Sequence, residues 1–171
     1  MLRQNRLRWK LRRTPSVQGV QPTTPGYDET MTDITTSHQI DIAAPPERVW
    51  EALTTPEQIS KWFFGVDTES DWQVGSSLIH RGEYQGQRYE DKGEILELNP
   101  PKRFVHTHWS PMSGLPDMPE NAQRVTWTLE PIDGLTTLTV AEENLPSEQA
   151  KATSDKSWPQ ALESLRELVE R

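Results

Sequence analysis

Two histidines and a glutamate are the residues whose chemistry stands out in this sequence. His106 and His108 lie two positions apart in a segment with strand character, so both side chains project to the same face. If that face also carries Phe104, the histidines point toward the protein interior. Glu142 continues the inward phase of a second strand. Titratable groups in an apolar pocket have shifted pKa values, which makes His106, His108 and Glu142 candidate general acids and bases.

The sequence leaves other interpretations of these three residues open. Two histidines and a carboxylate can ligate a metal, and the same residues can face solvent or form a satisfied hydrogen-bonded pair. An acid and a base in an apolar pocket would suit the cyclisation or dehydration of a polyketide-like substrate. No nucleophile motif, phosphate loop or dinucleotide fingerprint accompanies them. We expect neither a metal nor another cofactor.

The elements that carry these residues are strands of a meander. Turn residues rich in Gly and Pro separate segments of strand length, and the alternation is cleanest at Val125–Leu129 and Leu138–Ala141. One face of the sheet therefore looks inward and the other meets water. The predicted strands lie at about 34–42, 66–72, 76–84, 87–98, 103–109, 123–130 and 135–142.

Helices are predicted in two places. Pro46 and Pro56 each suit the first turn of a short helix between the first two strands. A second pattern, an apolar stripe with charged residues opposite, indicates an amphipathic C-terminal helix that packs on the sheet. That stripe consists of Trp158, Leu162, Leu165, Leu168 and Val169.

Composition limits the classes of function. The 171 residues suit one domain, and the absence of Cys excludes disulfides and thiolate zinc sites. No apolar run approaches a membrane span, so we expect a cytoplasmic protein. The net charge of −8 includes a basic N-terminal segment, which leaves the rest still more acidic. We therefore expect neither nucleic acid nor a membrane as a partner of the domain.

The basic segment, residues 1–30, is rich in Pro and lacks apolar periodicity. We expect it to be a disordered extension, with a domain over 31–171. A nucleic-acid arm or an organelle presequence would fit the segment, but so would a misplaced start, with Met31 opening the protein.

Four segments, in this order and spacing, carry a resemblance to a known family. They are Ala44–Thr54 (APPERVWEALT), Gly93–Phe104 with its double-proline turn, Val125–Pro131, and the helix that contains Trp158. Over about 34–170 the chain resembles the START-like SRPBCC superfamily, and within it the activator of heat shock protein 90 ATPase homologue family. Two positions depart from the family pattern: Ser157 stands where Gly is usual, and Glu142 where many members carry His.

The resemblance implies an α+β helix-grip fold, also called birch-pollen-allergen-like. In it a seven-stranded curved antiparallel sheet, two short helices and a long C-terminal helix enclose a cavity. The cavity would hold a small hydrophobic molecule, although an apolar stripe is more often simply core. The expected lining is Trp62, Phe104, His106, His108, Val125, Trp127, Leu129, Leu138, Val140, Glu142, Leu162 and Leu165.

The long connection after the histidines suggests a lid or a partner surface, because it carries Met112, Leu115 and Met118. Small-molecule binding is our first hypothesis for function. A polyketide cyclase or dehydratase-like activity comes second. A co-chaperone role with a heat shock protein 90 type partner, which only the family name implies, comes third.

Overall fold

The computed structural model describes residues 31–171; the extension predicted for residues 1–30 lies outside them. The described chain forms seven strands and three α-helices, which confirms the predicted α+β helix-grip fold. The order along the chain is β1 (Thr36–Ile42), α1 (Pro46–Thr54), α2 (Pro56–Trp62), β2 (Asp67–Ser70), β3 (Ser77–Tyr84), β4 (Gln87–Asn99), β5 (Arg103–His108), β6 (Gln123–Ile132), β7 (Leu135–Glu143) and α3 (Glu148–Val169). Two short 3-10 turns, Pro111–Ser113 and Pro119–Asn121, lie between β5 and β6.

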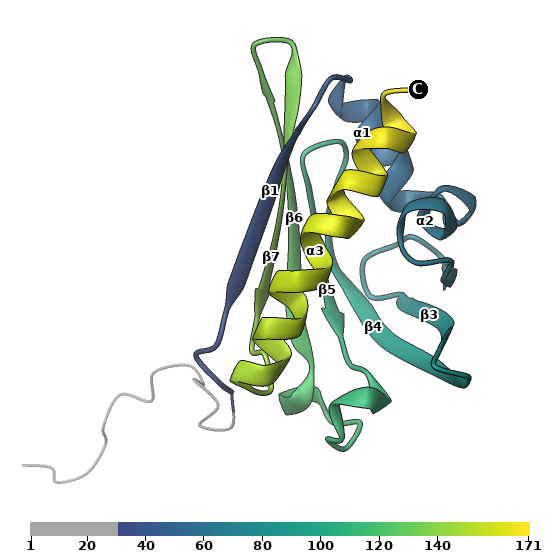
Figure 1. Ribbon diagram of the computed structural model, residues 1–171, viewed down its shortest axis with the longest axis vertical. Coiled ribbons are helices and arrows are strands. Elements are labelled where there is room, and N and C mark those ends of the chain that lie inside the picture. Colours follow the sequence, from purple (N-terminus) through teal and green to yellow (C-terminus); the bar gives the residue numbers. More distant parts are fainter. Residues whose placement is uncertain (1–30) are drawn as a thin grey trace, which may run out of the picture.

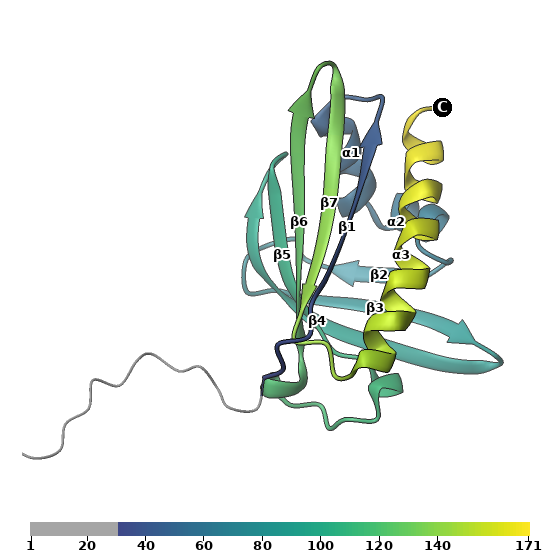
Figure 2. The ribbon, with the colours of Figure 1, turned by 60° about the vertical axis from the view of Figure 1, so that its left-hand side comes forward.

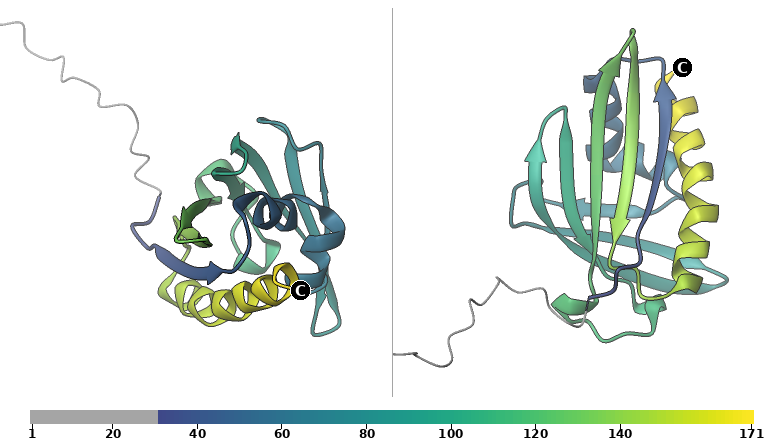
Figure 3. Two further views of the ribbon diagram at one scale, coloured as in Figure 1. Left: turned by 90° about the horizontal axis from the view of Figure 1, so that it is seen from above. Right: turned by 90° about the vertical axis from the view of Figure 1, so that its left-hand side faces the viewer.

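All neighbouring strands pair antiparallel, in the order β1-β7-β6-β5-β4-β3-β2. The long helix α3 runs along the sheet, with α1 and α2 beside its C-terminal half (Figure 1). β3 and β4 run at a steep angle to β6 and β7, so the sheet curves around the helices (Figures 2 and 3). This curvature leaves the strands and α3 facing each other across the interior.

The short helices follow from local sequence. Proline occupies the first turn of both α1 and α2, where its missing N–H leaves no hydrogen bond unmade. α1 buries Val49, Ala52 and Leu53, and α2 buries Ile59 and Trp62. Each helix therefore presents one apolar face to the core.

The helix α3 is longer than its apolar stripe. It begins at Glu148, capped by the Ser147 hydroxyl, which accepts a hydrogen bond of 3.1 Å from the Ala150 N–H. Its buried residues start only at Trp158. The first half of α3 thus carries small and polar side chains, and hydrophobic periodicity alone does not reveal it.

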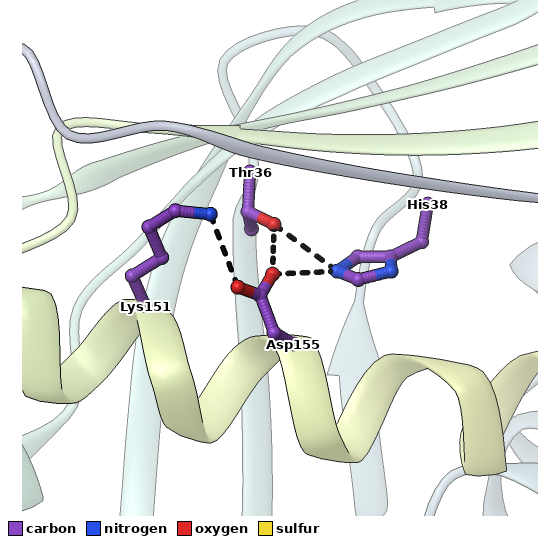
Figure 4. A network of polar contacts seen from close by, with 4 residues as sticks. All are labelled: Thr36, His38, Lys151 and Asp155. Atoms are coloured by element: carbon purple, nitrogen blue, oxygen red, sulfur yellow. Dashed lines mark hydrogen bonds and ion pairs between the residues drawn. The ribbon is translucent and has the colours of Figure 1, made fainter.

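A polar cluster attaches that first half of α3 to β1 (Figure 4). One oxygen of Asp155 accepts a hydrogen bond from the Thr36 hydroxyl and lies 3.0 Å from Nε2 of His38. The other oxygen lies 3.0 Å from Nζ of Lys151, one helical turn away. The Thr36 hydroxyl, followed by Lys151, lowers the pKa of Asp155 to about 2. This cluster holds α3 at the sheet edge without large apolar residues.

One glycine permits a close approach of β4 to β5. A Cβ atom on Gly93 would lie 1.9 Å from the carbonyl oxygen of Thr107. On one side of this point, the backbones of Lys92 and Trp109 exchange hydrogen bonds of 2.9 and 2.7 Å. Only glycine fits at this position. The close approach also brings Asp91, two positions before Gly93, beside the end of β5.

We expect Gly93→Ala to destabilise the protein by about 2–3 kcal/mol, because the methyl group meets backbone that cannot rotate away. Gly82→Ala is the matched control, since its added Cβ meets only the side chain of Tyr89. That variant should lose less than about 1 kcal/mol. Urea denaturation measures both losses, and equal losses would contradict the role assigned to Gly93.

Candidate functional site

A cavity of about 310 Å³ lies between the sheet and the helices. Its apolar lining is Leu53, Ile59, Trp62, Phe63, Phe64, Trp72, Leu78, Phe104, Val125, Trp127 and Trp158. Its polar lining is His80, Asp91, His106, His108, Glu142, Thr153, Ser154 and Ser157. Phe64 is 61% exposed, so the cavity meets the surface beside it.

Aromatic rings build the apolar wall. The ring of Trp127 packs edge-on against Trp62 and Trp158, with centroids 6.0 and 5.3 Å apart. Phe63 stacks on Trp158 at 5.7 Å. The indole N–H of Trp62 donates to the Ala52 carbonyl at 2.9 Å, so this buried ring leaves no polar atom unpaired. Three elements, α2, β6 and α3, are joined through these rings.

The cavity remains open because the part of α3 that faces it carries small side chains. Thr153, Ser154 and Ser157 line the cavity from the first half of the helix. Toward the C-terminus, Ala161, Leu162 and Leu165 are at most 2% exposed and belong to the core. Large side chains thus fill one end of the interior, whereas small ones leave the other end unfilled.

Sheet register places the polar residues on one face. His106 of β5 pairs with Val125 of β6, and Val125 pairs in turn with Glu142 of β7. Directly paired residues project to the same side of a sheet, so all three side chains face the cavity. His108 lies two positions after His106 and faces the same way.

His106 is a neutral hydrogen-bonding residue. Its Nδ1 lies 2.9 Å from the carbonyl oxygen of Thr107, which can only accept, so we assign the ring hydrogen to Nδ1. Nε2 then accepts from the indole N–H of Trp127 at 3.3 Å. Burial lowers the pKa of His106 to about 3. Both ring nitrogens are occupied, which makes this residue a poor acid or base at neutral pH.

His108 has the opposite character. Its Nε2 lies 3.1 Å from Oδ2 of Asp91, and their side chains are 27% and 15% exposed. Burial alone would lower the pKa of His108, but the hydrogen bond and charge of Asp91, together with Glu142 and Gln123, outweigh burial and raise it. His108 and Asp91 therefore form the pair best suited to hold or move a proton.

Five titratable residues of the lining interact with one another and form the polar end of the cavity: His80, Asp91, His106, His108 and Glu142. Two carboxylate oxygens at this polar end have no hydrogen-bond partner among residues 31–171. They are Oδ1 of Asp91 and one oxygen of Glu142, both buried. Glu142 as a whole is 6% exposed. Buried acceptors without a partner are costly, and they point to a group that is supplied from outside the chain.

The sequence did not reveal His80 and Asp91 as members of the site. They pair directly in the hairpin of β3 and β4, whose turn is Gln85-Gly86. Nδ1 of His80 lies 2.9 Å from the Thr68 hydroxyl, and burial, with the nearby His108, lowers the pKa of His80 to about 4. A register counted outward from that tight turn could have identified this pair.

Several predicted cavity residues lie elsewhere. The structure brings Trp62, Phe104, His106, His108, Val125, Trp127 and Glu142 to the cavity. Five others, Leu129, Leu138, Val140, Leu162 and Leu165, are in the packed core instead, because the C-terminal half of α3 fills that end of the sheet.

The predicted lid residues do not line the cavity. Met112, Leu115 and Met118 are 59%, 37% and 47% exposed on the connection between β5 and β6. Their side chains face solvent, and this connection lies beyond the end of β5 that carries His108.

No group of three or more potential ligands suited to a metal ion occurs within residues 31–171. Within the same range, no helix is both long and apolar enough to cross a membrane.

The sheet, the gripping helix and the cavity between them define a START-like protein of the SRPBCC superfamily. The sequence profile of the family "Activator of Hsp90 ATPase homolog 1-like protein" matches residues 43–170, and the chain belongs to this family.

Solved structures agree with this assignment. ChR145 from Cytophaga hutchinsonii is 36% identical, with a TM-score of 0.69 over 82% of this chain and 95% of that chain. CV1439 from Chromobacterium violaceum is 28% identical, with a TM-score of 0.68 over 80% and 97%. The Aha1 dimer from Colwellia psychrerythraea, 24% identical with a TM-score of 0.65 over 80% and 96%, shares the fold. The comparison with curated proteins found no match.

The low pKa of His106 predicts a loss of stability in acid. Above pH 6.5 the imidazole is neutral in both folded and unfolded chains and adds no pH dependence. Between pH 6.5 and about 3 only the unfolded chain takes up the proton. The free energy of unfolding should therefore fall by about 1.4 kcal/mol per pH unit on account of this residue.

The measurement is urea denaturation between pH 7.5 and 5, on the native protein and on His106→Gln, which cannot titrate at this position. The variant should show a shallower slope by about one proton. Identical slopes would mean that His106 is already protonated or exposed in the folded protein.

Proposed function

We propose that this protein binds a small, largely apolar organic molecule in the cavity between the sheet and α3. The observation that carries the proposal is a cavity of about 310 Å³ whose lining combines aromatic rings with histidines and carboxylates. That combination is typical of small-molecule sites, in which apolar surface supplies affinity and a few polar groups fix orientation. The volume suits a small organic molecule rather than a peptide or a nucleic acid.

The energetics support a ligand. Unpartnered, buried carboxylate oxygens reduce the stability of the folded chain. A packed apolar core would avoid these losses. Natural proteins retain such unfavourable groups mainly at functional sites.

Backbone conformation gives separate support. Phe64 and Trp72 line the cavity with φ of 50° and 53°, a region that bulky side chains rarely adopt. Strained residues of this kind cluster at ligand sites, where the surrounding structure holds them in place. Both residues contribute to the lining of the cavity.

A second candidate function is acid–base catalysis on the bound molecule. The pairing of His108 with Asp91 at 3.1 Å favours it, because a carboxylate that orients an imidazole is a common way to prepare a general base. Cyclisation or dehydration of a polyketide-like compound remains the reaction class that fits best. His106 no longer belongs among the catalytic candidates, since both its nitrogens are occupied.

A role with a heat shock protein 90 type chaperone rests on the family description and on the fold shared with Aha1. Fold alone is a weak basis for function, so this role stands third. A pull-down with the chaperone would test it.

Filling the cavity should prevent binding. Ser157→Leu places a larger side chain into the cavity from α3 and should reduce ligand affinity by about tenfold or more. Lys156→Leu is the matched control, because the adjacent position is exposed and outside the lining. Native mass spectrometry of the purified protein, followed by thermal shift against lipid, polyketide and flavonoid panels, supplies the ligand. Unchanged binding in Ser157→Leu would place the ligand elsewhere.

Catalysis should depend on His108 rather than on its neighbour. His108→Gln should still bind the compound but lower its turnover by about a hundredfold or more. In the native protein the rate should follow a group that titrates above pH 6.5, as the raised pKa of His108 requires. Turnover that survives in this variant would assign the chemistry to another group.

A further inference from the structure

We propose that the ligand carries a cationic amine, and that this head group binds between Asp91 and Glu142 at the polar end of the cavity. The inference rests on the proposed function and specifies the class of ligand. It follows from charge, from unpartnered atoms and from the surrounding rings.

The polar end is an acceptor of positive charge. Asp91 and Glu142 are its carboxylates, and its three histidines do not all offset them. The pKa values of His80 and His106, about 4 and 3, keep both imidazoles neutral near pH 7. Only His108 has a raised pKa, and its Nε2 already lies 3.1 Å from Asp91. At most one cationic side chain therefore faces the two acidic ones.

The free atoms here are acceptors. Oδ1 of Asp91 and one oxygen of Glu142 are buried and find no donor within residues 31–171. An ionised carboxylate only accepts hydrogen bonds, so a complementary ligand group must donate. A protonated amine offers three donors and a positive charge, whereas a ligand carboxylate or phosphate would add a third negative charge without a donor.

The neighbouring wall favours the same chemistry. Phe104 lies 4.9 Å from the ring of His106 and 6.1 Å from that of Trp72, so aromatic surface adjoins the polar end. The faces of such rings attract cations, most strongly where water is excluded. A ligand with an apolar skeleton and one amine would thus pack against the aromatic wall and donate hydrogen bonds to the carboxylates.

Three compounds with one carbon skeleton test the assignment: naphthylmethylamine, naphthylmethanol and naphthoate. Isothermal titration at pH 7 should rank the amine first and naphthoate last, with at least about a tenfold difference between them. Glu142→Gln should weaken amine binding by about tenfold while leaving the protein folded, because the change removes a buried charge and keeps the shape. Asp91→Asn is the second variant and should act in the same direction.

Glu143→Gln is the matched control, since it makes the same charge change one residue away. Glu143 is exposed and pairs with Arg124 at 3.5 Å on the other face of β7. The Glu143→Gln variant should bind the three compounds with the same affinities as the native protein. If naphthylmethanol or naphthoate binds as tightly as the amine, the cationic assignment is wrong and the proposed function stands. The same conclusion follows if Glu142→Gln and Glu143→Gln weaken amine binding equally. Binding of none of the three compounds would count against both.

Discussion

The indole of Trp127 is the contact on which the rest of the site depends. Its ring packs on Trp62 of α2 and on Trp158 of α3, so one side chain of β6 holds both helices against the sheet. Its N–H donates to Nε2 of His106. Because that nitrogen must then be an acceptor, His106 stays neutral. The same residue therefore builds the apolar surface and marks where the polar end begins.

Stability and function are separated along α3. The C-terminal half of the helix supplies Leu162 and Leu165 to a filled core, whereas the first half presents Ser154 and Ser157 to the cavity. A helix half without large apolar residues gains little stability from burial. Polar contacts of the cluster around Asp155 attach this half to β1 instead. The filled end can thus support an open end that contains unpartnered carboxylates.

Much of the fold could be predicted from the sequence, because alternation and Gly/Pro turns are local signals. Local signals also gave the shared face of His106 and His108 and the inward phase of Glu142. They could not tell that Leu138 and Val140, in the same phase as Glu142, lie in filled core. That distinction depends on which half of α3 lies opposite each residue. Asp91 was missed for a similar reason, since its contact with His108 needs the close approach at Gly93 as well as the strand register.

The contrast between His106 and His108 shows how environment decides the role of a residue type. Both face the same cavity from the same strand, yet burial lowers the pKa of the first, and the Asp91 carboxylate raises that of the second. The difference arises from partners on other strands, an indole donor on β6 and a carboxylate on β4. A neutral imidazole with two occupied nitrogens can only fix geometry, whereas an imidazole whose pKa is raised by a carboxylate can exchange a proton. The polar end is therefore defined by the strands that meet there, and the His-x-His pattern alone does not reveal which histidine serves it.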